Sequence, residues 1–200
     1  MAKIKSKKNG TKKETIIDAA ARLFHQKGFS ATSMRDLAEQ VGVEAASLYN
    51  HIQSKSEILQ EICFSVANLF TANIEDVDNS EMNAIQKVEA LLRFHIRQMV
   101  HHFENVYVSD REWKHLTDPY LSNYQNQRRI YRKRFAAIIR QGIESQEIKN
   151  MDAPTAVLIM LHAISGIESW HRSKKKISPE LLEDNMLLIL VEGVKMDVHQ

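Results

Sequence analysis

The sequence is poor in the residues that build disulfide-rich, β-rich or membrane-spanning proteins. It has one cysteine, Cys63, with six glycines and three prolines among its 200 residues. A single cysteine excludes an internal disulfide, and scarce glycine and proline argue against the closely spaced turns of an all-β chain. The longest apolar run, residues 156–161, is far shorter than the about 20 residues that span a bilayer. These shortages predict an all-α chain in a reducing, cytoplasmic environment, with no membrane partner.

The charge is nearly balanced but unevenly distributed along the chain. Residues 1–52 hold nine Lys and Arg against five Asp and Glu, whereas the remainder is slightly acidic. A basic segment ahead of a slightly acidic one favours a polyanion partner for the basic segment alone. The lysines of residues 3–8 are equally consistent with a solvated tail. No signal peptide is expected, because no apolar run follows these lysines.

Three capping signals mark the starts of helices in the first sixty residues. In each, a Ser or Thr is followed three residues later by an acid, the pattern of a capping box. Gly28 is expected to end the first helix and Gly42 to turn the chain after the second, because glycine adopts backbone conformations that strain other residues. The signals are Thr11 with Glu14, Ser33 with Asp36 and Ser54 with Glu57; they predict helices over 11–27 and 33–41 and one from 54 onward, with a short helix at about 44–51.

Apolar residues recur at helical spacing through the rest of the chain. The acidic stretch at residues 75–80 is predicted to be a loop. The helices expected after it cover about 81–102, 109–116, 119–146, 152–172 and 178–196.

Residues 28–59 have the pattern of a helix–turn–helix, whose second helix enters the DNA major groove. The first turn of such a helix needs small or polar side chains, which contact thymine methyl groups and base edges. Flanking polar and basic groups are expected to bind phosphates. The alternative places Tyr49 against the first helix and leaves His51 an ordinary surface residue. The candidate DNA-binding residues are Thr32, Ser33, Arg35, Ala45, Ala46, Ser47, Tyr49, Asn50, His51 and Lys55.

The segment from Thr11 to Leu59 resembles the DNA-binding head of the TetR family of bacterial transcriptional regulators. Two residues depart from the family pattern: Glu44 stands where Ser or Thr usually caps the helix, and Ile52 where Phe is usual. Because Glu44 near a phosphate is unfavourable, we expect DNA affinity to be modest or to depend on the lysine arm. The matching landmarks are Ala20, Phe24, Gly28-Phe29, Thr32-Ser33, Leu37-Ala38, Val41-Gly42-Val43, Leu48-Tyr49-Asn50-His51, Lys55, Glu57 and Leu59.

This resemblance implies an all-α fold of about nine helices, with an N-terminal three-helix head and a larger helical body. Residues 1–53 would form the DNA-binding domain with its basic arm, and residues 54–200 the ligand-binding and dimerisation domain. The last two helices would pair with those of a second subunit as a four-helix bundle. The implied function is repression of genes until a small molecule binds the body.

The body carries polar side chains that are costly to bury without partners, which suggests a ligand cavity. Taken singly, each of them is better explained by a satisfied core or a subunit contact, whereas Trp113, Tyr124, Arg128 and Tyr131 together favour a site. The long helix over residues 124–135, followed by Gly142 and residues 167–170, also resembles the body of family members that sense acyl-coenzyme A. The basic stretch at residues 128–134 suits either a phosphate-bearing ligand or a solvated helix face. The candidate ligand-binding residues are His95, Met99, Trp113, Tyr124, Arg128, Tyr131, His162 and Trp170.

Two segments, residues 156–161 and 186–191, are apolar on every side of a helix. A helix packed on one core needs a single apolar stripe, so a second subunit is the simplest cover for the surplus. A homodimer through the last two helices would present two reading helices to a palindromic operator.

Three functions therefore compete. The first is a repressor released by a small-molecule effector, and the second is a ligand-independent DNA-binding regulator with a solid core. The third is a helical enzyme or metal protein that uses the nine histidines. No metal-binding His pair with a supporting carboxylate, nucleophile motif or glycine-rich phosphate loop is evident, so we expect neither catalysis nor a cofactor.

Overall fold

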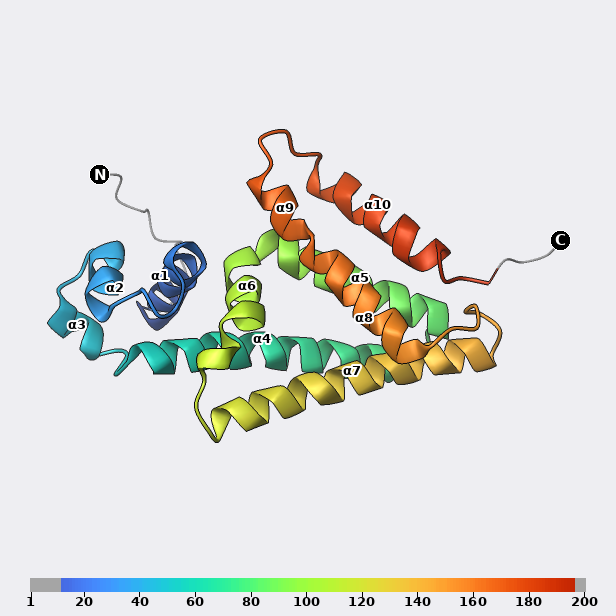
Figure 1. Ribbon diagram of the computed structural model, residues 1–200, viewed down its shortest axis with the longest axis horizontal. Coiled ribbons are helices and arrows are strands. Elements are labelled where there is room, and N and C mark those ends of the chain that lie inside the picture. Colours follow the sequence, from blue (N-terminus) through green and yellow to red (C-terminus); the bar gives the residue numbers. More distant parts are fainter. Residues whose placement is uncertain (1–11, 197–200) are drawn as a thin grey trace. The chain divides into compact units, whose positions relative to one another are not determined.

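Helices make up nearly all of the regular structure in the computed structural model, which describes residues 12–196. The basic arm and the predicted cap Thr11 lie outside the described residues. Within 12–196 there are ten α-helical segments and one 3-10 turn, and the only β-type pairing is an isolated bridge between Ile148 and Lys195. The expected all-α fold is confirmed (Figure 1).

The chain divides into two compact units. The first contains residues up to Asn68 together with Glu104–Gln125, and the second contains Leu69–Phe103 and residues from Asn126 onward. The boundary expected between residues 53 and 54 falls inside the first unit.

The first unit contains the three-helix head and the segments that complete its core. These are α1 (Lys12–Lys27), α2 (Met34–Val41), α3 (Ala45–Tyr49), the first part of α4 (Lys55–Asp78), α6 (Phe103–Arg111), the 3-10 turn η1 (Trp113–His115) and the start of α7 (Tyr120–Glu144). Phe24, Leu37 and Leu48 pack in one apolar cluster with Ile58, and Val108 of α6 belongs to the same cluster.

The second unit is built around α5 (Ala84–His101), which contacts α8 (Ala153–Ser165), α9 (Ile167–Arg172) and α10 (Pro179–Glu192) (Figure 1). Most of α7 and the end of α4 belong to it as well. A close approach occurs at Gly142, where a Cβ would lie 2.5 Å from Ile148 Cδ1 and 3.0 Å from Ala84 Cβ.

The side-chain caps were predicted more accurately than the boundaries that lack one. Ser33 caps α2 in a full capping box with Asp36. Ser54 Oγ accepts the Glu57 N–H, while the Glu57 carboxylate accepts the N–H of Gln53, one residue earlier than in the standard pattern.

The loop predicted at residues 75–80 is wrong, because α4 continues to Asp78. Ile74 and Val77 are buried and extend the apolar stripe, so the acids between them occupy the exposed side of the helix. The helix predicted at 109–116 is also shifted: α6 begins at Phe103 and ends at Arg111, and η1 follows.

The helix predicted over 152–172 is interrupted. The Gly166 N–H bonds to the carbonyl of Ala163, three residues back, and this tight turn separates α8 from α9. Counting these two segments as one gives the expected nine α-helices within residues 12–196. The last helix ends at Glu192 instead of Met196, because residues 194–196 leave it to pair with residues 147–149.

Candidate nucleic-acid interface

The turn between α2 and α3 has the geometry that a helix–turn–helix requires. Gly42 has φ 78° and ψ 34°, a left-handed conformation that strains residues with a Cβ. Its N–H bonds to the carbonyls of Ala38 and Glu39 and so ends α2. Leu37 and Leu48 are fully buried on either side of the turn, which fixes the two helices against the same core.

The short helix α3 exposes nearly every side chain that it carries. Leu48 is its one buried residue, and Tyr49 is 52% exposed. Tyr49 is therefore not buried under the first helix, as the alternative had proposed. The predicted residues that are exposed on and directly after this helix are Ala45, Ala46, Ser47, Tyr49, Asn50 and His51.

Glu44 occupies the N-cap position of α3 and makes no side-chain capping hydrogen bond. The start of α3 therefore lacks the stabilisation that Ser or Thr would supply there. The exposed carboxylate adds negative charge beside the first turn, where small side chains are presented. The departure from the family pattern thus has a local structural consequence.

The start of α2 presents a second group of candidates. Ser33 and Arg35 are exposed, and the Asp36 carboxylate accepts hydrogen bonds from the Ser33 backbone N–H and hydroxyl and from Lys27 Nζ. The hydrogen bond from the Ser33 side chain and then that from Lys27 lower the pKa of Asp36. Thr32, by contrast, is 2% exposed, and its hydroxyl donates to the Gly28 carbonyl at 2.9 Å. Its side chain is therefore turned into the protein.

Lys55 lies at the first position of α4, but its ammonium is directed back into the first unit. It donates to the carbonyls of Phe29 at 2.7 Å and Thr32 at 2.8 Å, with a longer contact to Ser30 at 3.4 Å. Nothing in the sequence pattern indicated these acceptors, because they belong to a connection twenty-odd residues away.

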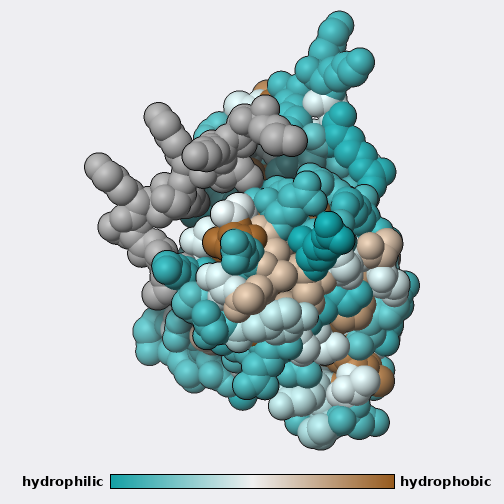
Figure 2. Space-filling view, turned by 90° about the vertical axis from the view of Figure 1, so that its left-hand side faces the viewer, coloured by the Kyte–Doolittle hydropathy of each residue, from teal (hydrophilic) through white to brown (hydrophobic). Residues whose placement is uncertain are grey.

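The side of the chain that carries α2 and α3 in Figure 1 faces the viewer in Figure 2. Most of the residues visible there are hydrophilic, and a smaller apolar area lies near the middle of the view (Figure 2).

The candidate ligand residues are divided between the two units. Trp113 and Tyr124 belong to the first unit, where their ring centroids are 6.2 Å apart and the Tyr124 hydroxyl donates to the carbonyl of Ser109. The other six belong to the second unit: His95, Met99, Arg128, Tyr131, His162 and Trp170.

Within the second unit, the half-buried His95 and the buried Tyr131 form a polar pair. His95 Nε2 and the Tyr131 hydroxyl share a hydrogen bond of 2.6 Å, and the Phe70 ring lies 4.4 Å from the imidazole centroid. Burial lowers the pKa of His95 to about 3 and raises that of Tyr131, so both groups are neutral at physiological pH. Phe70 had no signal in the sequence beyond the apolar stripe of α4.

The remaining candidates in this unit are occupied by local contacts. His162 is exposed and bonds through Nδ1 to the Leu158 carbonyl, and Trp170 Nε1 donates to that of Ile177. Met99 is buried, and its carbonyl accepts a hydrogen bond from His171. Arg128 is half-buried on α7.

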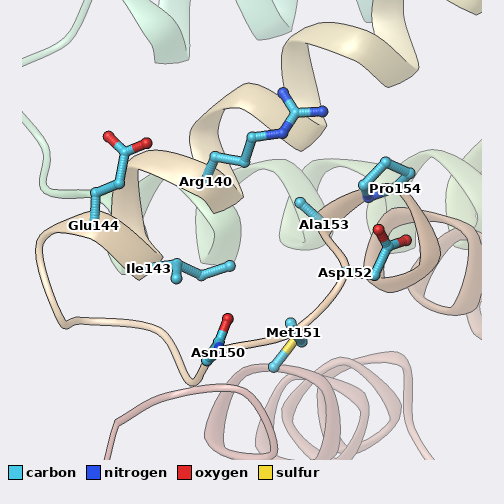
Figure 3. Close-up of a pocket in the computed structure, with 8 residues that line it drawn as sticks. All are labelled: Arg140, Ile143, Glu144, Asn150, Met151, Asp152, Ala153 and Pro154. Atoms are coloured by element: carbon cyan, nitrogen blue, oxygen red, sulfur yellow. The ribbon is translucent and has the colours of Figure 1, made fainter.

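A hollow of about 340 Å³ lies at the junction between α7 and α8. In Figure 3 the Arg140 side chain extends from α7 toward the side that carries Asp152 and Pro154, whereas Glu144 points away. None of the predicted ligand residues lines this hollow; its lining consists of Arg140, Ile143, Glu144, Asn150, Met151, Asp152, Ala153 and Pro154.

Helices α8 and α10 leave large apolar side chains uncovered. The inner side of α10 buries Glu183, Leu187 and Val191, while Ile189 on its other side is 71% exposed. The exposed apolar residues of the two helices are Leu158, Ile159, Leu181, Leu188 and Ile189. Among residues 12–196, no helix is long and apolar enough to cross a bilayer, and no group of His, Cys, Asp and Glu side chains is arranged to hold a metal ion.

The head and its exposed short helix define a helix–turn–helix DNA-binding protein. Residues 16–62 match the family model described as bacterial regulatory proteins, tetR family, and residues 81–194 match that of the tetracyclin repressor-like C-terminal domain. The chain therefore belongs to the TetR family and is a DNA-binding transcriptional regulator.

Individual relatives agree with this assignment. The HTH-type transcriptional repressor KstR2 of Mycobacterium tuberculosis is 23% identical over 181 residues, which cover 90% of each chain. The structure of this ketosteroid transcriptional regulator has a TM-score of 0.87 at 22% identity, covering 95% of this chain and 98% of that one. AibR, in complex with isovaleryl coenzyme A and operator DNA, has a TM-score of 0.78 at 23% identity, covering 90% and 98%.

Proposed function

We propose that the chain is a dimeric repressor that leaves a palindromic operator when a small molecule binds its body. The observation that carries this proposal is the exposure of α3, which buries Leu48 alone and presents small and polar groups from Ala45 to His51. In this proposal residues 1–53 read DNA, and residues 54–200 hold the effector and form the dimer. A cytoplasmic location and the lack of a catalytic role are parts of the same proposal.

The DNA contacts divide into two kinds. Ala45, Ala46 and Ser47 lie in the first turn of α3 and would contact base edges, where alanine suits a thymine methyl group and serine a polar edge. Tyr49, Asn50 and His51, together with the cap Ser33 and with Arg35 of α2, would contact phosphates and fix the register. The Thr32 hydroxyl is engaged within the protein, so we assign it no direct contact.

Dimerisation through α8 and α10 is supported by the five large apolar side chains that these helices expose. Contiguous apolar surface on a protein in water typically marks an interaction site. A twofold axis would place two copies of α3 about 34–36 Å apart, or a multiple of that, on one side of the duplex.

The effector would be a small molecule, and an acyl-coenzyme A is our first candidate. AibR was solved with isovaleryl coenzyme A as well as operator DNA, which makes this class the natural one to test. In this chain the neutral pair His95 and Tyr131, beside the Phe70 ring, would offer a hydrogen bond to an uncharged oxygen.

A ligand-independent regulator with a solid core is the second candidate. The observation in its favour is that His95 and Tyr131 satisfy each other at 2.6 Å, as core residues do. A titration of the protein–operator complex with isovaleryl coenzyme A and with free coenzyme A separates the two. Release of DNA by the thioester alone supports the ligand-responsive repressor; DNA retained with every acyl chain length from two to about eighteen carbons supports the solid-core regulator.

A further inference from the structure

The ammonium group of Lys55 has a full set of acceptors inside the first unit. Its Nζ donates to the carbonyls of Phe29 at 2.7 Å, Thr32 at 2.8 Å and Ser30 at 3.4 Å. An ammonium carries three N–H donors. The carbonyls of Phe29 and Thr32 take two of these donors at normal hydrogen-bond distances, and the longer contact to Ser30 takes the third, so a phosphate oxygen would have to displace one of these carbonyls.

The ring of Phe29 gives the connection between α1 and α2 a second point of attachment. Lys55 Nζ lies 4.3 Å from the ring centroid, and the imidazole of His115 in η1 stacks on the ring at 5.2 Å with 25° between the planes. The ring of Phe24 meets Phe29 edge-on at 5.2 Å. Phe29 is buried, so these contacts fix its position in the core of the first unit.

The segment that these contacts hold is the connection between α1 and α2. It begins at Gly28, which has φ 83°, and ends at Ser33, the cap of α2. The first turn of α2 carries Arg35, and α2 in turn contacts α3. The position of this connection therefore decides where the start of α2 stands against the duplex, and such placement matters at the scale of about 0.5 Å.

We propose that Lys55 supports DNA binding as a positioning residue that holds the α1–α2 connection, with His115 as the second support of Phe29. Lys55 is not a phosphate ligand in this assignment. The proposal rests on the DNA contacts proposed above, and it adds to them a residue of η1 far along the chain from the head. Arg35, which is exposed at the start of α2, keeps the role of phosphate ligand.

Substitution of Lys55 by arginine separates the two roles. Arginine binds a phosphate at least as well as lysine does, but its planar fork does not fit three carbonyls that converge on a compact ammonium. The measurement is the anisotropy of a labelled mixed-sequence duplex of about 30 base pairs, titrated with the full-length chain at several salt concentrations between about 50 and 200 mM.

We expect Lys55→Arg to weaken binding about tenfold, as the loss of one or two backbone hydrogen bonds would, while the slope of log K against log salt is unchanged. Arg35→Ala is the matched control, and it should flatten the slope by about one unit. His115→Ala should weaken binding at unchanged slope, and His115→Phe, which keeps a ring against Phe29, should restore it. Wild-type affinity in Lys55→Arg would overturn the positioning role.

A second measurement needs no variant and so does not depend on whether the variants fold. In the wild-type protein, scalar couplings across the hydrogen bonds should connect Lys55 Nζ with the carbonyl carbons of Phe29 and Thr32, both free and bound to the duplex. Loss of these couplings on DNA binding would overturn the proposal. If the wild-type chain bound no duplex at low salt, the proposed DNA contacts would fail and the positioning role with them; if only the Lys55 and His115 results differed, the positioning role alone would fail.

Discussion

The guanidinium of Arg97 on α5 binds the carboxylate of Glu183 on α10 through two parallel hydrogen bonds, Nε to Oε2 at 2.8 Å and Nη2 to Oε1 at 2.9 Å. Arg93 donates to the same carboxylate. Glu183 is 9% exposed, and only Leu187 and Val191 accompany it on the buried side of α10. The attachment of α10 therefore depends strongly on one acid, although the partial exposure of both arginines limits the energy of these ion pairs.

Replacing this acid should loosen α10 and weaken the dimer. We expect Glu183→Gln to lower the free energy of unfolding by about 1–2 kcal/mol, because charged hydrogen bonds are lost while the arginines are partly solvated. Chemical denaturation and sedimentation at several concentrations measure the two effects. Glu180→Gln, an exposed acid in the first turn of α10, is the control and should change neither.

The ion pair between Arg97 and Glu183 should make the free energy of unfolding depend on pH. The hydrogen bonds from Arg97, followed by the one from Arg93, lower the pKa of Glu183 below its ordinary value of 4.5. Its stabilising contribution is therefore complete above pH 4.5 and is lost as the pH falls through the lowered value. Acid denaturation followed by circular dichroism should show this loss in the wild type and a smaller one in Glu183→Gln. Identical acid profiles would contradict the assignment.

The burial of His95 should make the free energy of unfolding depend on pH in a higher range than Glu183 does. Burial lowers its pKa from 6.5 to about 3, so below pH 6.5 the unfolded chain takes up a proton that the folded chain does not. Stability should fall with pH from 6.5 toward 5, by at most about 1.4 kcal/mol per pH unit from this group. His95→Gln should reduce that slope, while His162→Gln, at an exposed histidine, should leave it as in the wild type.

Gly142 tests the packing of the second unit. A Cβ there would meet Ile148 at 2.5 Å and Ala84 at 3.0 Å, so Gly142→Ala should cost about 1–3 kcal/mol as an overpacked site. Gln141→Ala, at the exposed neighbouring position, should be close to neutral. An equal melting temperature for Gly142→Ala and the wild type would show that Ile148 moves aside freely.

Ala46 should decide which sequences bind. Its exposed side chain lies in the first turn of α3, so Ala46→Asn should change the preferred base pair, with a discrimination of about 1–3 kcal/mol at that position. Selection from a randomised duplex library measures the preference. An unchanged preferred sequence would remove Ala46 from the reading surface.

The sequence predicted best what depends on neighbouring residues. Ser33 and Asp36 lie within one turn, as do Ser54 and Glu57, so both caps and the turn at Gly42 were evident. The end of α4 was missed because the acids at 75 and 76 suggested a loop, while the burial of Ile74 and Val77 that continues the helix depends on tertiary packing.

The candidate site also combines features set by neighbouring residues with features set by tertiary packing. Exposure of α3 follows from its short pattern of one buried leucine, and it was predicted. The acceptors of Lys55, the stacking of His115 on Phe29 and the pairing of His95 with Tyr131 join residues 23 or more positions apart. Local patterns carry no information on such pairs, so residues proposed for phosphate or ligand binding proved to have partners within the chain.

In the proposed dimer, two symmetry-related copies of α3 read the bases of one operator. The most direct measurement is selection of duplexes by the wild-type chain from a randomised library, followed by footprinting of the enriched sequence. We expect an inverted repeat whose half-sites are centred about 10–10.5 base pairs apart, or a multiple of that, with the major groove protected in each. An asymmetric single site, or no enrichment and no binding at low salt, would contradict it.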